Sequence, residues 1–576
     1  MQFLSNLKAE MAEPTPSKRS LRDYWLYLGF AEGYTQPVPI ARAMASASLF
    51  DKHKKHIYKN DRIAGSLRGA IFDMGEDISD ETLQHAKRIV QSFGANTFVT
   101  NADHFCADYV TFLQEGIPGT LERIYASLMV HAEDEKRVCF LRAAEIAMQG
   151  FAKMVAGYGE AALARAAEKD VTAEQRNELT KVGETCLYLV DHKPETFRQA
   201  LQLVFLTHTA FLYEERYAMA LGRMDQYLWP FYEKDLACGR ITKEEARSLL
   251  ECTFYKIGER QYKGGDDVVN IAIGGRKRDG TGGVNELSYL IIDAVRNCNI
   301  PGPNLSARIY DGIPDAFLDA CLQSIGTGLG YPALMNDEIN IPALHRHGYA
   351  IEDARDYCMV GCIENFLPGQ QPPWSDGRYN SPKYLELAIN NGKCLQTGVQ
   401  MGPKTGEPHQ FANMKEFIEA VEAQMEFGAA EYMRLFKNEN ERYNKIQYTQ
   451  PFLSCFCQDC IGRGLDINDG GALYPSVHGA GCMGIATMAD SLAAVEQLVF
   501  EEKKLTLSEL RKALTADFVD FEELHKELLQ APKYGNNDDR VDKYAVWYVE
   551  VHDKIFSHHR TWDGGAVYTA IASNVN

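Results

Sequence analysis

The sequence predicts an α/β protein in which helices alternate with short strands. Thr242-Lys243-Glu244-Glu245 has the form of a capping box, and apolar residues follow it at helical spacing. The run from Val268 to Ile273 is rich in β-branched residues and is flanked by glycines, which predicts a strand. This alternation is typical of α/β folds, and a chain of 576 residues with 45% hydrophobic residues can bury a substantial core.

The other elements follow along the chain. Residues 80–260 are predicted to be mainly helical, and a helix is expected to begin near Thr506-Leu507-Ser508-Glu509. The run from Val567 to Val575, which follows two glycines, predicts a final strand. We expect the outer edge of this strand to be unpaired, which makes it a docking point for a second chain.

Composition excludes several classes of partner. The net charge of −19 argues against nucleic acid or an anionic membrane as the main partner. The segment Met1–Lys8 becomes polar too early for a secretory signal, and no apolar run reaches transmembrane length. Fourteen cysteines without an export signal predict a cytoplasmic protein whose thiols stay reduced.

The strongest functional signal lies in residues 357–380. Cys362 follows Gly361 and stands two residues before Glu364, in a loop rich in glycine and proline. A thiol and a carboxylate at this spacing can face one small molecule, the thiol as nucleophile or hydrogen-atom donor and the carboxylate as proton carrier. The alternative is that Cys362 is a buried core thiol.

Gly361-Cys362-Ile363-Glu364 resembles the cysteine loop of the glycyl radical enzymes, in their eliminating and decarboxylating branches. Further segments resemble that family in the same order, so that the resemblance covers most of the chain. These segments are 222–232, 239–242, 303–308, 328–338 and 353–357 before the loop, and 451–454, 470–474 and 490–494 after it.

The resemblance implies a ten-stranded glycyl-radical-enzyme barrel surrounded by helices, built as two five-stranded halves with the cysteine loop inside. Residues 1–576 are expected to form a single catalytic domain. Because glycyl radicals are destroyed by oxygen, the resemblance also implies an anaerobic setting.

One family motif is missing. The family stores its radical on a glycine within Arg-Val-(Ser/Ala)-Gly-(Tyr/Phe), and no such motif occurs here, since neither Arg137-Val138 nor Arg540-Val541 leads to a glycine. We therefore expect an incomplete barrel that lacks the C-terminal glycine-radical segment. The radical is expected on a second subunit or on a missing segment, through a natural split or because the chain is a fragment. A radical S-adenosylmethionine activase is expected to install it, and this chain is expected to bind no cofactor itself.

By analogy with the family, the thiyl radical of Cys362 takes a hydrogen atom from the substrate and Glu364 acts as general base. His104 resembles a family histidine that reaches the departing hydroxyl, although a lone histidine is more often structural. Tyr217 stands near the place of a second histidine in some diol dehydratases, where it would bind substrate or only pack. Glu214 and its neighbours beside Tyr217 are compatible with a solvated helix face.

Asp376 and Trp374 lie beyond the cysteine loop, in a stretch that resembles diol-dehydrating members of the family. There an aspartate holds a substrate hydroxyl, and we expect both residues to contribute to substrate binding. The alternative for Asp376 is an Asx-turn beside Gly377. Dehydratases of this branch tend to have proline after the glutamate, where this chain has Asn365, so the identity of the substrate stays open.

Cys455, Cys457 and Cys460, with His478 and Cys482 after them, raise the question of a metal site. The spacing lacks a second Cys-x-x-Cys pair, so core thiols are favoured and no metal is expected. The glycine-rich residues 274–283 lack the Gly-Lys-(Ser/Thr) of a phosphate loop and are predicted to form a charged turn.

Together these features predict a lyase, the large catalytic part of a split glycyl radical enzyme. Its expected reaction is thiyl-radical elimination from a small polar molecule, either a dehydration or another C–X cleavage. One alternative is an arylacetate decarboxylase, and another is a non-catalytic homologue that serves as an assembly partner. A homo-oligomer is compatible with all three.

Overall fold

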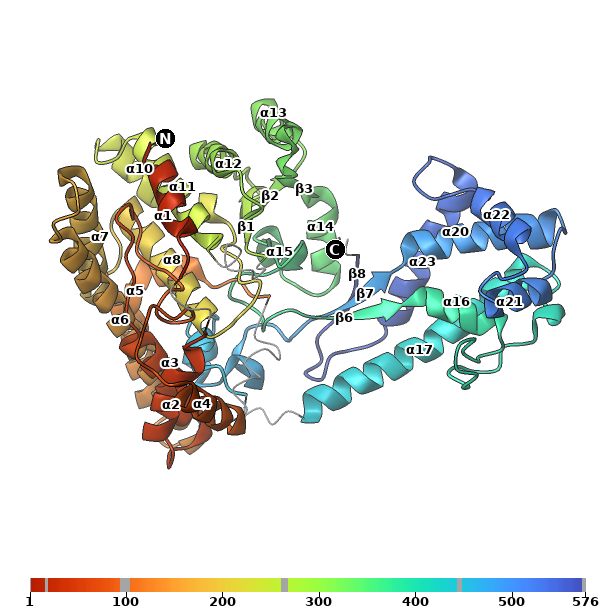
Figure 1. The fold of residues 1–576 in the computed structure, drawn as a ribbon, viewed down its shortest axis with the longest axis horizontal. Coiled ribbons are helices and arrows are strands. Elements are labelled where there is room, and N and C mark those ends of the chain that lie inside the picture. The colour runs from red at the N-terminus through yellow and green to blue at the C-terminus, as the bar shows by residue number, and fades with distance from the viewer. Residues whose placement is uncertain (1, 16–18, 94–103, 260–267, 443–447, 572–576) are drawn as a thin grey trace. The chain divides into compact units, whose positions relative to one another are not determined.

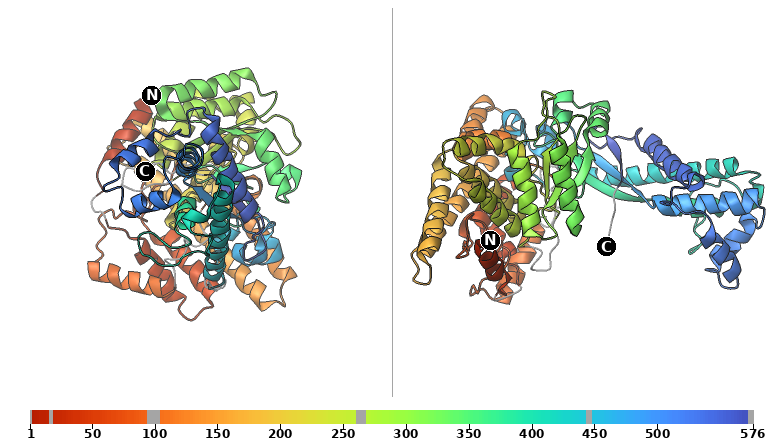
Figure 2. Two further views of the ribbon diagram at one scale, coloured as in Figure 1. Left: turned by 90° about the vertical axis from the view of Figure 1, so that its right-hand side faces the viewer. Right: turned by 90° about the horizontal axis from the view of Figure 1, so that it is seen from above.

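The computed structural model describes residues 2–15, 19–93, 104–259, 268–442 and 448–571. Its residues group into two compact units, drawn in Figures 1 and 2. The first unit comprises residues 1–374 and 444–475, and the second comprises residues 375–443 and 476–576. The expectation of one catalytic domain across residues 1–576 stays a prediction.

The first unit is mostly helical, with five short strands. Its elements are α1 (Gln2–Ala12), α2 (Arg22–Glu32), α3 (Val38–Lys52), α4 (Asp80–Ser92), α5 (Tyr109–Val130), α6 (Glu135–Ala166), α7 (Ala173–Asp191), α8 (Phe197–Tyr213), α9 (Met224–Tyr227), α10 (Trp229–Ala237), α11 (Lys243–Ile257), β1 (Asn270–Gly274), α12 (Glu286–Cys298), β2 (Asn304–Ile309), α13 (Asp315–Ser324), η3 (Ile325–Leu329), β3 (Ala333–Asn336), α14 (Asp337–Arg346), α15 (Ile351–Arg355), β4 (Cys358–Val360), β5 (Glu364–Phe366), α18 (Pro451–Ser454), α19 (Cys460–Arg463) and η5 (Ile467–Gly471).

The second unit has three strands and a helical layer. Its elements are β6 (Ser375–Asn380), α16 (Ser381–Ile389), η4 (Pro408–Gln410), α17 (Met414–Arg442), β7 (His478–Met483), α20 (Ile485–Val495), η6 (Glu496–Glu501), α21 (Leu507–Thr515), α22 (Glu522–Gln530), α23 (Asp539–Phe556) and β8 (Val567–Ala570).

The strands of the first unit form a parallel sheet and a hairpin. The sheet has the order β1-β2-β3, with α12 and α13 as the crossover helices that parallel neighbours need. Parallel bridges from Cys106 to Ala220 and from Gly222 to Ile271 extend it on the β1 side. Strands β4 and β5 pair antiparallel.

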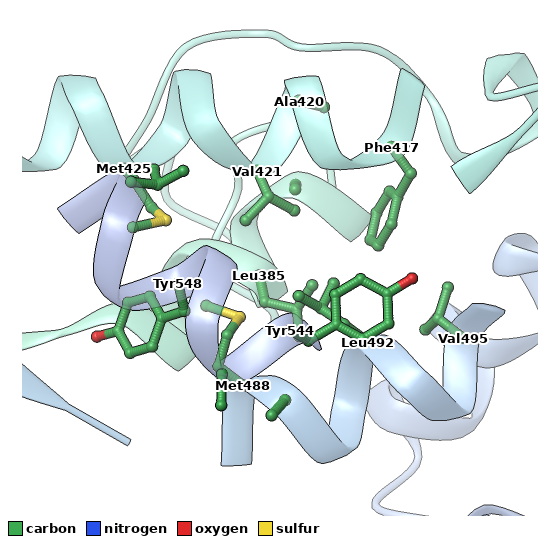
Figure 3. Close-up of a cluster of buried hydrophobic side chains, with 14 of the residues drawn as sticks. Leu385, Phe417, Ala420, Val421, Met425, Met488, Leu492, Val495, Tyr544 and Tyr548 are labelled. Atoms are coloured by element: carbon green, nitrogen blue, oxygen red, sulfur yellow. The ribbon is translucent and has the colours of Figure 1, made fainter. Parts of the chain in front are cut away.

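The second unit is built on the parallel sheet β6-β7-β8. Apolar side chains from α16, α17, α20 and α23 form its core, as Figure 3 shows for Leu385, Val421, Leu492 and Tyr544. In the sheets of the described residues, β8 has a single strand neighbour, β7.

The elements predicted from sequence patterns are confirmed. Thr242 caps α11 with the predicted capping box, and the helix expected near Thr506 is α21, which begins with a capping box at Thr506. The strand expected at 268–273 is β1, and the final strand is β8, whose predicted continuation over 572–576 lies outside the described residues. Open sheets of three, two and three strands, rather than one closed barrel, are what the described residues form.

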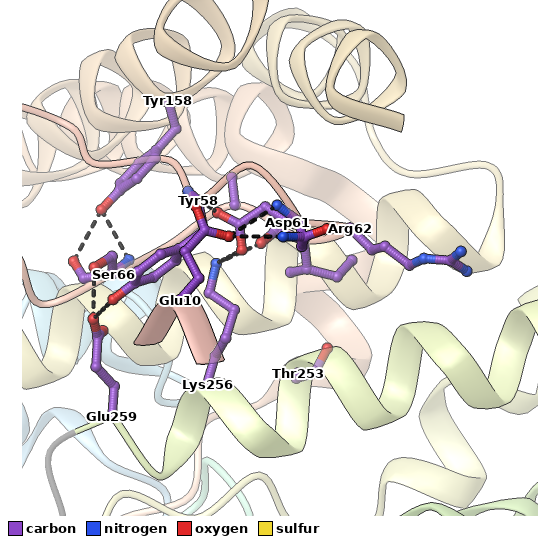
Figure 4. Close-up of polar contacts among 12 residues, drawn as sticks. Glu10, Tyr58, Asp61, Arg62, Ser66, Tyr158, Thr253, Lys256 and Glu259 are labelled. Carbon is purple, nitrogen blue, oxygen red and sulfur yellow. Dashed lines mark hydrogen bonds and ion pairs between the residues drawn. The ribbon is translucent and has the colours of Figure 1, made fainter. Parts of the chain in front are cut away.

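Buried charges tie the segment between α3 and α4 to the end of α11 (Figure 4). Lys256 Nζ lies 2.6 Å from Asp61 Oδ1, with both side chains fully buried. Glu259 accepts hydrogen bonds from the hydroxyls of Tyr58 and Ser66. Because removing one partner would leave a buried charge uncompensated, these contacts fix the register of the segment against the helix.

Among the residues that the structure describes, no helix is long and apolar enough to cross a membrane.

His208 in α8 makes the stability of the first unit depend on pH. It is fully buried, neither ring nitrogen has a hydrogen-bond partner among the described residues, and burial lowers its pKa to about 4. Since a histidine of the unfolded chain titrates near pH 6.5, acid favours the unfolded chain by up to about 1.4 kcal/mol per pH unit between about pH 6.5 and 4. We expect His208→Leu to flatten this dependence, measured by urea unfolding at several pH values, whereas substitution of the exposed His409 by leucine leaves it unchanged. Equal pH slopes for His208→Leu and the wild type would contradict this assignment.

Candidate active site

Cys362 lies at the tip of the β4–β5 hairpin. Val360 pairs with Glu364, which leaves Gly361, Cys362 and Ile363 as a three-residue turn. Gly361 has φ +54°, in the left-handed region that favours glycine. Cys362 is exposed, so the alternative of a buried core thiol does not hold.

His104 and Glu364 converge on Gly361. A Cβ atom at Gly361 would lie 2.3 Å from His104 Cδ2, 2.6 Å from His104 Nε2 and 2.7 Å from Glu364 Oε2. Because Gly361 has no side chain, the imidazole of His104 and the carboxylate of Glu364 can both lie against it, directly beside Cys362. These are two of the groups that the sequence predicted to act with the thiol.

Backbone hydrogen bonds hold His104 in this place. Its N–H donates to the carbonyl of Tyr217 and its carbonyl accepts from the N–H of Trp374, both at 3.0 Å. The rings of His104 and Tyr217 meet edge to face, with centroids 6.0 Å apart. Segments that are far apart in the sequence thus bring His104, Tyr217 and Trp374 to the Cys362 hairpin.

Asp376 lies on β6 of the second unit, opposite Gly479 in the sheet register. Its side chain is outside the described part of the structure. Its expected role in substrate binding stays a prediction.

The base of the hairpin is fixed by Arg308 of β2. This fully buried guanidinium forms two hydrogen bonds with Asp337 and donates to the carbonyls of Tyr357, at 2.9 Å, and Arg355, at 2.8 Å. Charge-assisted contacts of this kind are strong when fully satisfied. Three of the segments that resemble the family therefore meet at one buried cation just before β4.

Two residues of the site were missed in the sequence. Asn270 of β1 donates from Nδ2 to the carbonyl of Cys362 at 3.0 Å, and its Oδ1 accepts from the Ser306 hydroxyl at 3.1 Å. The signal that could have found Asn270 is its amide within the otherwise apolar run of residues 268–273.

The suggestion of a solvated helix face at residue 214 is wrong. Glu214 and Arg216 are buried and form an ion pair, and Ser46 donates to the Glu214 carboxylate. Since Tyr217 and Ala218, which has φ +57°, follow directly, this ion pair supports the segment that carries the carbonyl partner of His104.

The three cysteines considered for a metal site are unreactive because they are buried. Cys455, Cys457 and Cys460 are buried, and burial raises the pKa of the Cys455 thiol to about 12. They belong to the first unit, whereas His478 and Cys482 belong to the second. Within the described ranges, no group of three or more histidine, cysteine, aspartate or glutamate residues could hold a metal ion.

Comparison with known proteins gives the family. The pyruvate formate lyase-like family model matches residues 51–576. The chain is 30% identical over 517 residues to (2S)-3-sulfopropanediol dehydratase of Klebsiella oxytoca, covering 85% of this chain and 62% of that protein. It is 34% identical over 408 residues to trans-4-hydroxy-L-proline dehydratase of Clostridioides difficile, covering 67% and 51%.

A solved structure has the same fold. The glycerol-bound B12-independent glycerol dehydratase from Clostridium butyricum superposes with a TM-score of 0.88 at 28% identity, covering 98% of this chain and 80% of that one. The chain therefore belongs to the pyruvate formate lyase-like family, with the fold of the glycyl radical enzymes. It spans about half to three-fifths of the length of these two curated relatives.

We expect Gly361→Ala to destabilise the protein by more than the cost of placing an alanine at a left-handed φ. Gly239, with φ +69° and no atom within 4 Å of a Cβ position, is the matched control, and its change to alanine should cost about 1–2 kcal/mol of unfolding free energy. At Gly361 the methyl group also displaces His104 or Glu364, which adds at least about 1 kcal/mol. Urea unfolding of both variants measures the difference. Equal losses would contradict the close packing around Gly361.

Proposed function

We propose that this chain is the large catalytic part of a glycyl radical lyase that eliminates water or another leaving group from a small polar molecule. The observation that supports this most is the placement of His104 and Glu364 against Gly361, beside the exposed thiol of Cys362. The relatives named above are dehydratases, and isethionate sulfite-lyase of Nitratidesulfovibrio vulgaris, 34% identical over 405 residues, is another relative.

Cys362 would receive its radical from a glycyl radical, which would take the hydrogen atom of the thiol onto glycine and leave a thiyl radical at the Cys362 sulfur. The Cys362 thiyl radical is proposed to take a hydrogen atom from a substrate carbon, which forms the thiol and a substrate radical. The thiol later returns a hydrogen atom to the product radical, which regenerates the thiyl radical. The exposure of Cys362 at the hairpin tip leaves it accessible to a substrate. The thiol acts only as a hydrogen-atom carrier, so it needs no general base of its own.

Glu364 is proposed to take the proton that must leave the substrate radical before elimination. His104 lies against the same glycine and is proposed to orient or protonate the departing group. Tyr217 and Trp374 hold the His104 backbone and are proposed to shape the substrate pocket. Asp376 is proposed to bind a substrate hydroxyl.

Two rival functions are kept because each has an observation in its favour. The 4-hydroxyphenylacetate decarboxylase glycyl radical subunit of Clostridioides difficile is 29% identical over 446 residues, which keeps radical decarboxylation open. The missing radical motif favours a non-catalytic assembly partner. The two rivals predict turnover of 4-hydroxyphenylacetate and no turnover, respectively.

We expect Cys362→Ser to abolish turnover without loss of folding, because a hydroxyl is a far poorer hydrogen-atom donor than a thiol. Glu364→Gln should keep substrate binding and lower kcat by roughly 10²–10⁴-fold, as expected for loss of a general base. The assay uses the chain activated together with a polypeptide that carries Arg-Val-x-Gly-Tyr, and the substrates are glycerol, isethionate, trans-4-hydroxy-L-proline and (2S)-3-sulfopropanediol. Cys238→Ser, at the other exposed thiol, is the control. Turnover by Cys362→Ser would contradict the thiyl mechanism.

We also propose that the radical-bearing glycine lies outside residues 1–576. The edge of β8 away from β7 is the proposed docking place for the segment or subunit that carries this glycine. Residues 1–576 alone should give no glycyl radical signal after treatment with a radical S-adenosylmethionine activase, because they lack the motif. Addition of a polypeptide with Arg-Val-x-Gly-Tyr should give one. Anaerobic electron paramagnetic resonance measures both, and a glycyl radical doublet from residues 1–576 alone would contradict this proposal.

A further inference from the structure

We propose that Asn270, oriented by Ser306, is a positioning residue that fixes the peptide unit between Cys362 and Ile363 and thereby the direction of the Cys362 thiol. The catalytic meaning of this inference rests on the proposed function. The geometry itself does not depend on it.

Both ends of that peptide unit are held. Its carbonyl, from Cys362, accepts from Asn270 Nδ2 at 3.0 Å. Its N–H, from Ile363, donates to Glu364 Oε2 at 3.1 Å. Because the C=O and N–H of a planar peptide unit point in opposite directions, these two bonds fix its rotation relative to the Cys362 Cα. A rotated unit would break both bonds.

The Cys362 carbonyl can only accept, so it requires the NH₂ end of the Asn270 amide to face the hairpin, and Ser306 holds the other end. Asn270 is fully buried on β1, and its Oδ1 accepts from the Ser306 hydroxyl of β2 at 3.1 Å. With its oxygen engaged there, the amide presents its NH₂ group to Cys362. A reversed amide would place oxygen against the Cys362 carbonyl and would lose the hydrogen bond to it.

The two residues belong to one polar face of the β1–β2 sheet. The register pairs Asn270 with Asn304 and Ala272 with Ser306, so Asn270, Asn304, Ser306 and Arg308 alternate onto the same side. Through Asn270 this face contacts the tip of the hairpin, and through Arg308 it contacts its base at the Tyr357 carbonyl. Asn304 instead accepts a hydrogen bond from the Tyr331 hydroxyl at 2.6 Å, so it is a matched control on the same face.

This contact matters because Cys362 stands on a short exposed turn. Hydrogen-atom transfer requires the sulfur to be held near both its radical source and the substrate carbon, and misplacement by about 1 Å costs rate steeply. Buried groups under the tip supply the order that an exposed side chain lacks. Asn270 and Ser306 thus act on the reaction through the Cys362 backbone, without contact with the substrate.

The test measures thiol alkylation in the protein before activation, so that it does not depend on turnover. Iodoacetamide labelling is followed by peptide mass spectrometry, and the ratio of labelling at Cys362 to that at Cys238, the other exposed cysteine, is compared. We expect Asn270→Ala to raise this ratio at least about threefold, because the freed tip samples more reactive orientations. Ser306→Ala should raise the labelling ratio less than Asn270→Ala does. Ser306→Thr, which keeps the hydroxyl, should show the wild-type ratio, and Asn304→Ala should leave the ratio unchanged.

If Asn270→Ala does not fold, the Ser306→Ala and Ser306→Thr pair decides the question. Ratios for Asn270→Ala and Ser306→Ala equal to that for Asn304→Ala would overturn the proposal. In the activated enzyme, kcat of Ser306→Ala should fall while KM stays near its wild-type value, since the substrate pocket is intact. A wild type without turnover in the presence of the radical-bearing polypeptide would contradict the proposed function, whereas the alkylation ratios would still decide the role of Asn270.

Discussion

The absence of a side chain at Gly361 is the constraint on which the candidate site depends. A methyl group there would overlap the imidazole of His104 and the carboxylate of Glu364. Those two groups come from segments more than 250 positions apart, and they meet only because this one position offers no volume. Its left-handed φ turns the chain sharply enough to expose the following thiol. Gly361 thus provides the room for His104 and Glu364, the sharp turn of the chain and the exposure of the Cys362 thiol.

Around Gly361, hydrogen bonds to backbone groups hold His104 and the β4–β5 hairpin in place. His104 is held through its N–H and its carbonyl, and the hairpin is held at the carbonyls of Tyr357 and Cys362. The side chains of His104 and Cys362 therefore need not serve as structural anchors themselves. The supporting groups, Arg308 and Asn270, are fully buried, so water competes little with their hydrogen bonds.

Sequence patterns predicted the elements that depend on local physics. The capping box at Thr242, the helix start near Thr506 and the strand of residues 270–274 follow from hydrogen bonding and burial within a few residues. The buried ion pair of Glu214 and Arg216 was not predictable in this way, because its charges resemble those of a solvated helix face until the fold surrounds them. Asn270 was overlooked for a related reason, since its partner is a backbone carbonyl 92 positions away.

Both the local sequence and the tertiary structure distinguish Cys362 from the other thirteen cysteines. The pattern Gly-Cys-x-Glu singled it out, and the fold adds that only Cys362 and Cys238 are exposed while most other thiols are buried. Cys106 lies only two positions after His104, yet burial raises the pKa of its thiol well above the ordinary value. A thiol in that environment resists ionisation and is shielded from a substrate. Proximity to the site therefore does not by itself make a cysteine functional, and exposure at a glycine-made turn is the property that distinguishes Cys362.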